Sequence, residues 1–283
     1  MKNGMNIAFA SGKGGTGKTT VATNLALSIE NVQFIDCDVE EPNANIFIKE
    51  KITKSEKITI KIPKIDNKKC DYCGYCSELC AYNALAVVPS NVLVFPELCH
   101  SCGGCEIVCP KDAINWEERI IGKIEHNHQS KKIDFYHGLL NVGEMQAIPI
   151  IKSLKRKINE NKNVIIDAPP GTSCPVIESI IGSDYCILVT EPTPFGMHDL
   201  KLAIEVVRHL NIPFGVIINR DGIGDDKVEQ YCQNKNIPVL LKIPEKRMIA
   251  HLYSKGIPLV SKSFEWHEMF GQVFNIIQEE VKK

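Results

Sequence analysis

Gly12-Lys-Gly-Gly-Thr-Gly-Lys-Thr19 lies between a short apolar run, residues 7–10, and a stretch with helical periodicity at residues 19–29. The octapeptide fits G-x-x-x-x-G-K-[S/T] in the strand–loop–helix context that this pattern requires. Its glycines let backbone N–H groups close around a phosphate, and the following helix N-terminus adds a positive dipole. We therefore expect a phosphate-binding loop in which Lys18 contacts the β- and γ-phosphates and the Thr19 hydroxyl ligates Mg²⁺.

Similar apolar runs recur along the chain, and each ends in a loop or turn signal. They lie at residues 32–35, 164–166, 186–190 and 215–218, with helical patterns at about 143–159, 198–209 and 226–235. Continuous apolar strands that alternate with helices are typical of a parallel sheet covered on both faces. The sequence therefore predicts an α/β fold with a mostly parallel, doubly wound sheet and ligands at the carboxyl ends of its strands.

Two copies of one cysteine run, 29 residues apart, interrupt this alternation. They are Cys70-x-x-Cys73-x-x-Cys76-x-x-x-Cys80 and Cys99-x-x-Cys102-x-x-Cys105-x-x-x-Cys109. The same shift aligns Ala84-Leu85 with Ala113-Ile114, which indicates a duplicated half-domain. This spacing is that of bacterial ferredoxins. We expect an inserted α+β domain of the 2[4Fe–4S] ferredoxin type at residues 62–117, and a discontinuous nucleotide-binding domain at 1–61 and 118–283.

In two-cluster proteins with this spacing, the fourth cysteine of each run ligates the other cluster. This rule assigns Cys70, Cys73, Cys76 and Cys109 to one [4Fe–4S] cluster, and Cys80, Cys99, Cys102 and Cys105 to the second. Zinc is the alternative ligand, although structural zinc usually joins paired C-x-x-C knuckles and not runs of this kind. The cluster potentials do not follow from the sequence.

The composition of the chain argues against some classes of binding partner and favours one cellular compartment. The 283 residues carry a net charge of −1, so the chain lacks the basic footprint of a general nucleic-acid binder. No apolar stretch approaches the roughly 18 residues that span a membrane, and no signal peptide is apparent. Eight of the 12 cysteines fall in the two runs beside a nucleotide motif, which favours reduced thiolates in a cytoplasm. The apolar-periodic residues 264–283 carry four glutamates, so we expect them to dock on the sheet and not on a membrane.

The phosphate loop carries an additional early lysine, Lys13, and a second threonine, Thr20, after Thr19. This form resembles the deviant Walker A motif of the MinD/ParA/Mrp ATPases and of the nitrogenase iron protein. The resemblance implies that ATP favours a homodimer in which Lys13 reaches the partner's phosphates. Lys13 and Lys18 would then be catalytic, because both neutralise charge on the transferred phosphoryl group.

Two further segments match this family. Asp36-Cys-Asp38 follows the second strand as switch I does, and the resemblance implies that Asp38 orients the attacking water and that Asp36 lies near Mg²⁺. Asp167-Ala-Pro-Pro-Gly171 resembles Walker B and switch II, in which Asp167 holds Mg²⁺ and the Gly171 amide senses the γ-phosphate. The nucleotide-binding set expected from the loop and the resemblance is Gly12, Lys13, Gly14, Gly15, Thr16, Gly17, Lys18, Thr19, Thr20, Gly171 and Asn219, the last as the adenine-contacting residue.

Three functions remain open at this stage. The first is ATP-gated electron transfer through two [4Fe–4S] clusters to a redox partner, with slow hydrolysis because no strong general base is apparent. The second is assembly or carriage of iron–sulfur or metal cofactors for an acceptor protein. Carriers of the Mrp type have a C-terminal C-x-x-C, whereas Cys232 is the only cysteine after Cys186 here. The third is ParA-like positioning with structural clusters. ATP is favoured over GTP because no N-K-x-D motif occurs. Cys174, which follows switch II, has no assigned role.

Overall fold

A mixed β-sheet forms the centre of the molecule, and the phosphate loop follows one of its middle strands. The structure is a computed structural model that describes residues 4–127 and 133–282. Within those residues the first seven strands of the sheet order run parallel, whereas β6 and β3 are antiparallel to their neighbours. In sheet order the strands are β11 (Val239–Pro244), β10 (Phe214–Asp221), β9 (Tyr185–Thr190), β1 (Asn6–Ala10), β8 (Asn163–Asp167), β2 (Val32–Asp36), β7 (Ile133–Leu140), β6 (Ile114–His126) and β3 (Lys54–Ile65).

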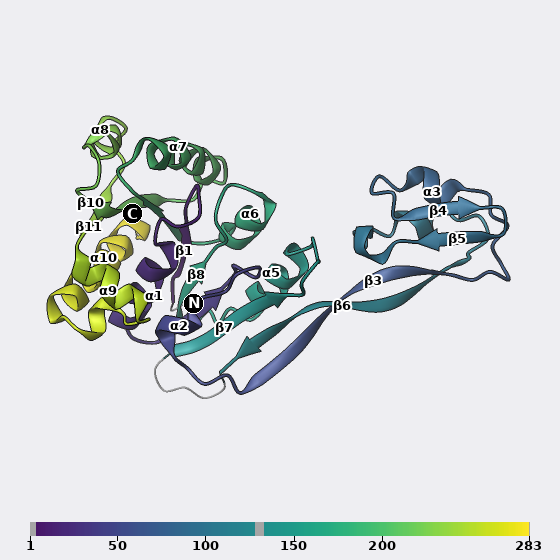
Figure 1. The fold of residues 1–283 in the computed structure, drawn as a ribbon, viewed down its shortest axis with the longest axis horizontal. Helices are drawn as coiled ribbons and strands as arrows, with labels where there is room; N and C mark the ends of the chain where they lie inside the picture. The colour runs from purple at the N-terminus through teal and green to yellow at the C-terminus, as the bar shows by residue number, and fades with distance from the viewer. Residues whose placement is uncertain (1–3, 128–132, 283) are drawn as a thin grey trace.

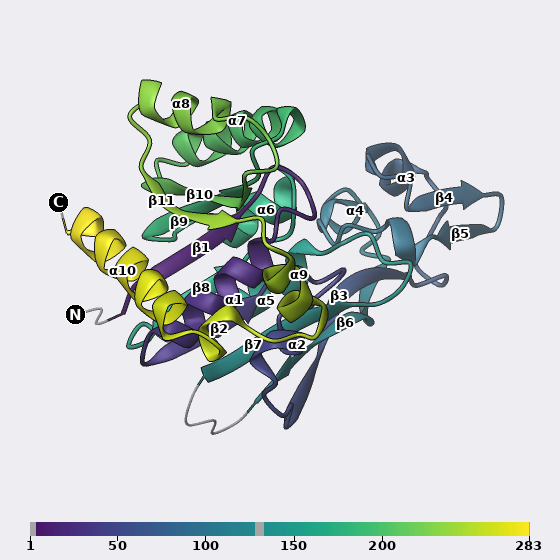
Figure 2. The same ribbon diagram turned by 60° about the vertical axis from the view of Figure 1, so that its left-hand side comes forward.

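Helices cover both faces of this sheet, as the alternation of apolar runs predicted (Figures 1 and 2). Strands β1, β2, β8 and β9 are mostly apolar, as expected for strands that are covered on both faces of the sheet. One face carries α1 (Lys18–Ser28), α2 (Asn45–Ile48), α9 (Arg247–Ser254) and α10 (Phe264–Val281), with the short η2 (Leu259–Ser261) before α10. The other face carries α5 (Ile148–Lys155), α6 (Cys174–Ile180), α7 (Pro194–His209) and α8 (Lys227–Asn234).

The C-terminal helix α10 docks on the body of the protein. Phe270, Val273, Phe274 and Ile277 are buried and belong to the same apolar core as α1 and the central strands. This packing confirms that the apolar stripe of residues 264–283 is used for docking. None of the helices in the described ranges is long and apolar enough to cross a membrane.

Strands β3 and β6 form a long ribbon that leaves the sheet and carries a small lobe at its far end (Figure 1). Their pairing runs from Lys54 opposite His126 to Ile65 opposite Ile114, with one register shift between Ile58 and Thr59, so the expected domain boundaries at 61/62 and 117/118 fall inside β3 and β6. The lobe contains α3 (Tyr75–Leu79), β4 (Leu85–Val88), β5 (Asn91–Val94), η1 (Pro96–Leu98) and α4 (Gly104–Ile107).

The lobe has an internal repeat with the same 29-residue spacing as the cysteines. Short helices begin after Gly74 and after Gly103. In the β4–β5 pair Leu85 lies opposite Val94, and in the β6–β3 pair Ile114 lies opposite Ile65, so each strand end has a counterpart 29 residues away. Each half therefore consists of a strand, a cysteine loop, a short helix and a second strand. The first strand of each half pairs with the last strand of the other, which binds the two halves into one unit.

Candidate functional site

The phosphate loop connects β1 to α1 at the carboxyl edge of the sheet. Gly17 adopts φ 85°, a conformation that favours glycine, immediately before the first residue of α1. A Cβ atom at Gly17 would lie 2.2 Å from the Asn219 amide nitrogen, which instead donates a 2.8 Å hydrogen bond to the Thr16 carbonyl. Asn219 comes from the end of β10, so this bond fixes the loop against the strand expected to contact the base.

Two adjoining hollows border the loop. The first, of about 150 Å³, is lined by residues 13–20 together with Asp38 and Pro170 from the two expected switch segments. The second, of about 200 Å³, lies between Gly15 and Gly17 on one side and Asn219, Arg220 and the β11–α9 segment on the other. Their shared border at the loop gives room for phosphates in the first and for a nucleoside in the second. Gly12 lines neither hollow because its α-carbon is pressed against the backbone of Asp199 in α7.

Lys18 and the buried carboxylate of Asp167 form an ion pair between the loop and the end of β8. Lys18 is 6% exposed and Asp167 is fully buried. The second oxygen of Asp167, Oδ2, has no hydrogen-bond partner among the described residues. A buried carboxylate with a free oxygen is the kind of group that a divalent cation, or its bound water, completes.

Asp36 adds a second buried carboxylate beside Asp167. Its Oδ1 accepts the Asp38 amide at 3.0 Å, and its Oδ2 accepts the amides of Asn43 and Ala44, each at 3.2 Å. Burial and the negative charge of Asp167 raise the pKa of Asp36 to about 8. Burial also raises the pKa of Asp38 to about 6, against the opposing effect of Lys18. Three carboxylates thus share one lysine, and this excess of buried negative charge fits Mg²⁺.

Mg²⁺ in nucleotide sites usually keeps several waters and is held through one or two carboxylates and the phosphates. The residues placed for it are Thr19, which lines the phosphate hollow, and the buried Asp167 and Asp36, of which Asp167 is paired with Lys18 of the same hollow. Around the phosphate hollow, no three His, Cys, Asp or Glu side chains of the described residues are gathered as direct ligands of one ion. Thr19 and Thr20 line the phosphate hollow, and Thr20 also lines the nucleoside hollow.

The Gly171 amide, expected to sense the γ-phosphate, donates a 2.8 Å hydrogen bond to the Ser11 carbonyl. Gly171 therefore lies beside the loop, but its N–H is already used within the chain. A phosphate could accept this N–H only after the bond to Ser11 opens. The structure thus places switch II against β1 in an arrangement that a nucleotide would have to change.

Lys13 is paired within its own chain. Its Nζ lies 2.5 Å from Glu191 Oε1, and the other carboxylate oxygen of Glu191 accepts from Arg220 at 3.0 Å. Glu191 is 8% exposed and therefore bridges two cations at a largely buried position. Neither Glu191 nor Arg220 was expected from the sequence. Their positions in the sequence could have identified them: Glu191 directly follows the apolar run 186–190, and Arg220 follows the run 215–218 and Asn219. Functional side chains of an α/β sheet gather at these carboxyl ends of the strands.

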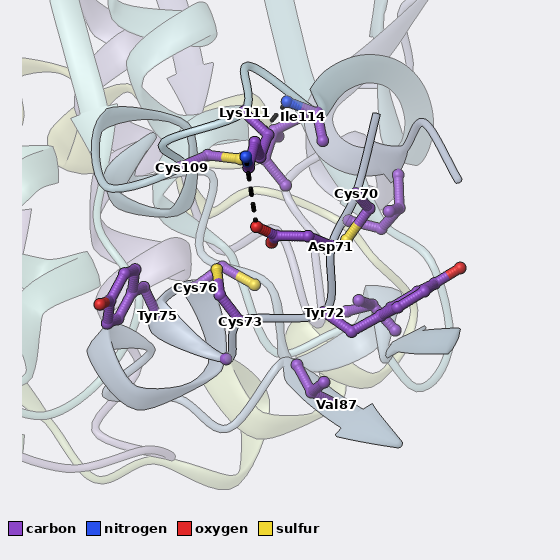
Figure 3. A pocket seen from close by; sticks show the side chains of 14 residues that line it. Cys70, Asp71, Tyr72, Cys73, Tyr75, Cys76, Val87, Cys109, Lys111 and Ile114 are labelled. Atoms are coloured by element: carbon purple, nitrogen blue, oxygen red, sulfur yellow. Dashed lines mark hydrogen bonds and ion pairs between the residues drawn. The ribbon is translucent and has the colours of Figure 1, made fainter. Parts of the chain in front are cut away.

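The eight cysteines of the lobe divide into two quartets, each lining its own hollow. One hollow is lined by Cys70, Cys73, Cys76 and Cys109, with the side chains approaching from two separate loops (Figure 3). The other is lined by Cys80, Cys99, Cys102 and Cys105. The fourth cysteine of each run thus lies with the first three of the other, which is the grouping that the ferredoxin spacing implies.

The surroundings of the two quartets repeat as well. The Ala84 amide donates to Cys80 Sγ and the Ala113 amide donates to Cys109 Sγ, both at 3.3 Å. Backbone donors of this kind stabilise thiolate ligands and help to set cluster potentials. Burial raises the pKa of Cys105 to about 11, so this thiol would need a bound cation to ionise at neutral pH. The donor set and its cradle therefore fit an iron–sulfur cluster at each hollow.

Comparison with known proteins decides the family. The profile of the CobQ/CobB/MinD/ParA nucleotide binding domain matches residues 7–259. The chain belongs to the CobQ/CobB/MinD/ParA family. An uncharacterized protein of Methanocaldococcus jannaschii is 35% identical over 266 residues, which are 90% of this chain and 91% of that protein.

This CobQ/CobB/MinD/ParA protein is also similar to an iron–sulfur cluster carrier protein and to a MinD structure. An iron–sulfur cluster carrier protein of M. jannaschii is 25% identical over 98% of this chain and 84% of its own length. The structure of the septum site-determining protein MinD of Pyrococcus horikoshii with Mg-ADP has a TM-score of 0.57 and 19% identity, covering 95% of this chain and 93% of that one. At this identity the MinD structure shows the fold, a mostly parallel α/β P-loop sheet.

The resemblance implies that ATP brings two copies of this chain together, and the Lys13–Glu191 pair bears on that expectation. Replacing Glu191 with glutamine should free Lys13 and tighten the dimer formed with a non-hydrolysable ATP analogue. Loss of one such partly exposed ion pair is worth about 0.2–1 kcal/mol, which corresponds to a dimer dissociation constant lower by up to about fivefold. Analytical ultracentrifugation at several protein concentrations measures it.

The matched control is Glu229→Gln, which removes an equivalent charge from a surface pair with Lys242, 2.7 Å away. This control should leave the dimer constant unchanged. If Glu191→Gln gives a dimer no tighter than the unsubstituted chain, Glu191 does not restrain Lys13.

Proposed function

We propose that this chain is a slow ATPase in which nucleotide-driven switch movement and dimerisation control electron transfer through two [4Fe–4S] clusters. The observation that carries this proposal is the division of eight cysteines into two quartets in a duplicated lobe, on the same chain as a phosphate loop. We assign the lobe, residues 62–117, as a ferredoxin-type domain and the remainder as the ATPase domain. When bound, the clusters would supply one-electron carriers.

The nucleotide site suggests how ATP acts. Lys18 would exchange its contact with Asp167 for the β- and γ-phosphates, and Mg²⁺ would take its place beside the carboxylates of Asp167 and Asp36. Gly171 would release Ser11 when its N–H turns toward the γ-phosphate. Both exchanges replace an internal bond by a bond to the nucleotide, so binding moves switch II at a small net cost.

Hydrolysis in this site would be slow. Asp38 lines the phosphate hollow and can hold a water by hydrogen bonding, but a carboxylate with a pKa of about 6 is a weak base for water. Lys13 would supply positive charge to the phosphates of the partner subunit once it leaves Glu191. In a slow ATPase of this kind, the ATP-bound state would last until two subunits assemble and each Lys13 reaches the phosphates of its partner.

The test is an anaerobic redox titration, followed by electron paramagnetic resonance, of the reconstituted protein without nucleotide, with ADP and with a non-hydrolysable ATP analogue. A change in the signal or midpoint potential of a cluster that is specific to the ATP state supports gating. Identical spectra and potentials in all three states would refute it.

Cofactor assembly or carriage is the second candidate, and the comparisons favour it specifically. Relatives named iron–sulfur cluster carrier proteins match 89–98% of this chain at 22–27% identity. This candidate predicts that iron and sulfide move from the loaded protein to an apo acceptor, faster with ATP. Transfer is measured as loss of iron from the chain after separation, and stable clusters with an ATP-dependent potential would favour the electron-transfer role.

A positioning role with structural clusters is the third candidate. It would require a surface for a membrane or for nucleic acid. The apolar stripe of α10 packs on the body, with Phe270 and Ile277 fully buried, so this helix is not available as a membrane anchor in this arrangement. Redox or acceptor proteins are therefore the partners that we propose, together with a second copy of the chain in the ATP state.

A further inference from the structure

The segment between β7 and α5, residues 141–147, contacts one of the cysteine quartets and directly follows the residue of β7 that is bonded to the switch I chain. At its start it continues from Leu140, whose amide donates a 2.8 Å hydrogen bond to the Val39 carbonyl. Val39 is buried and directly follows Asp38 of switch I. The end of β7 is thus bonded to the switch I chain one residue beyond Asp38.

The packing at this junction is tight. A Cβ atom at Gly138 of β7 would lie 2.6 Å from Val39 Cγ1 and 2.8 Å from Ile150 Cγ2. Only glycine allows switch I and α5 to approach β7 so closely. A displacement of Val39 must therefore be shared with β7 and α5, because no space is left between them.

At its other end the segment is bonded to the second quartet and to the ribbon that carries the lobe. The Gln146 side-chain amide donates a 2.5 Å hydrogen bond to the Cys99 carbonyl. Glu144 receives both guanidinium branches of Arg119 from β6, and Arg119 and Glu144 are 16% and 10% exposed. The Asn141 amide donates to the Ile121 carbonyl at 2.9 Å. These bonds clamp the segment between β6 and the loop that contains Cys99.

The two quartets differ in their relation to the body. Cys99 is buried in the same apolar core as Ile62, Ile121 and Ala147, which links the second quartet to the sheet. The loop of the first quartet is paired within the lobe, where Asp71 lies 3.6 Å from Lys111 (Figure 3). In Figure 2, α4, which contains Cys105 of the second quartet, lies nearer to the body than α3 of the first.

We propose that residues 141–147 couple the nucleotide state to the cluster held by Cys80, Cys99, Cys102 and Cys105, and that the other cluster does not respond. This inference rests on the proposed function, since it requires clusters at both quartets. Movement of switch I shifts Val39, the end of β7 follows, and Gln146 transmits the shift to the Cys99 backbone. A change in a backbone group next to a ligand alters the hydrogen bonding and dielectric that tune a cluster. Coupling of this kind requires direct demonstration by variants along the route.

The test compares three reconstituted full-length proteins, each without nucleotide and with a non-hydrolysable ATP analogue: the unsubstituted chain, Gln146→Leu, and Gln230→Leu as the matched control. Gln230 bonds to Asp226 on the exposed face of α8, far from the lobe. We expect ATP to change the electron paramagnetic resonance signal of one cluster in the unsubstituted chain and in the control. Gln146→Leu should lose most of that change and retain full iron content and unaltered nucleotide affinity.

The outcomes separate this inference from the proposed function. No ATP effect on either cluster in the unsubstituted chain would refute the proposed function and with it the coupling. An ATP effect that survives intact in Gln146→Leu would refute only the coupling. Should Gln146→Leu lose iron, Arg119→Lys serves instead, because it keeps the charge but breaks the two-branched bond to Glu144. In that case, retention of the full ATP effect in Arg119→Lys would overturn the proposal.

Discussion

Replacing Lys18 with alanine is expected to abolish nucleotide binding by this chain. Lys18 is the first residue of α1 and lines the phosphate hollow, so its Nζ is the nearest buried cation to a bound triphosphate. Two charge-assisted hydrogen bonds to phosphate are worth about 1.5–3 kcal/mol each, so their loss should weaken ATP binding at least 100-fold. Isothermal titration calorimetry with MgATP and MgADP measures the change.

The same substitution should destabilise the protein without nucleotide. Asp167 is fully buried and its ion pair is with Lys18, so the alanine variant leaves a buried carboxylate without that cation. Breaking a buried pair in this way costs about 3–5 kcal/mol unless the carboxyl group takes up a proton. Chemical unfolding followed by circular dichroism measures the free energy of unfolding.

Lys13→Ala is the matched control for this prediction. Lys13 is 30% exposed and pairs with Glu191 beside the loop, so its removal should leave nucleotide affinity within a few-fold of normal. The control should instead impair ATP-dependent dimerisation and hydrolysis. Affinity for MgATP that falls less than tenfold in Lys18→Ala would contradict the assignment of the loop.

The parts of the site that could be predicted from the sequence are those whose chemistry is local. A phosphate loop is contiguous, and its glycines and lysine occupy fixed positions between a strand and a helix. Asp36 and Asp167 were predicted from the resemblance of the segments that follow two buried strands to switch I and Walker B, and the structure places these carboxylates together because β2 and β8 are neighbours in register, Asp36 opposite Asp167. Five of the seven parallel strands, at residues 7–10, 32–35, 164–166, 186–190 and 215–218, followed from their apolar runs, and the docking of α10 followed from its apolar periodicity, whereas β11 was not predicted and β7 was not predicted as a parallel strand.

Contacts between distant segments could not be predicted. Glu191 meets Lys13, and Gln146 meets Cys99, across separations that no local pattern encodes. Strand β3 was also missed as an element of the sheet, although Ile58, Ile60 and Ile62 alternate with polar residues in the manner of a half-buried strand. Pro63 in β3 is tolerated because β3 is the edge strand.

The pairing of the cysteines into quartets gives the second large prediction. If Cys109 shares a cluster with Cys70, replacing both with alanine removes two ligands from one cluster and none from the other. The double variant Cys70→Ala/Cys109→Ala should therefore keep about four of about eight irons per chain, with one [4Fe–4S] signal of ordinary intensity. Iron analysis and electron paramagnetic resonance after anaerobic reconstitution measure both quantities.

The matched variant, Cys70→Ala/Cys80→Ala, removes the same number of thiols but takes them from one run. In the grouping seen in the structure, Cys70 and Cys80 line different hollows, so this variant should damage both clusters and retain little iron. If each run instead held its own cluster, the two double variants would exchange their results. The contrast thus tests the spatial grouping itself, because the number of cysteines lost is equal and only their distribution between the hollows differs.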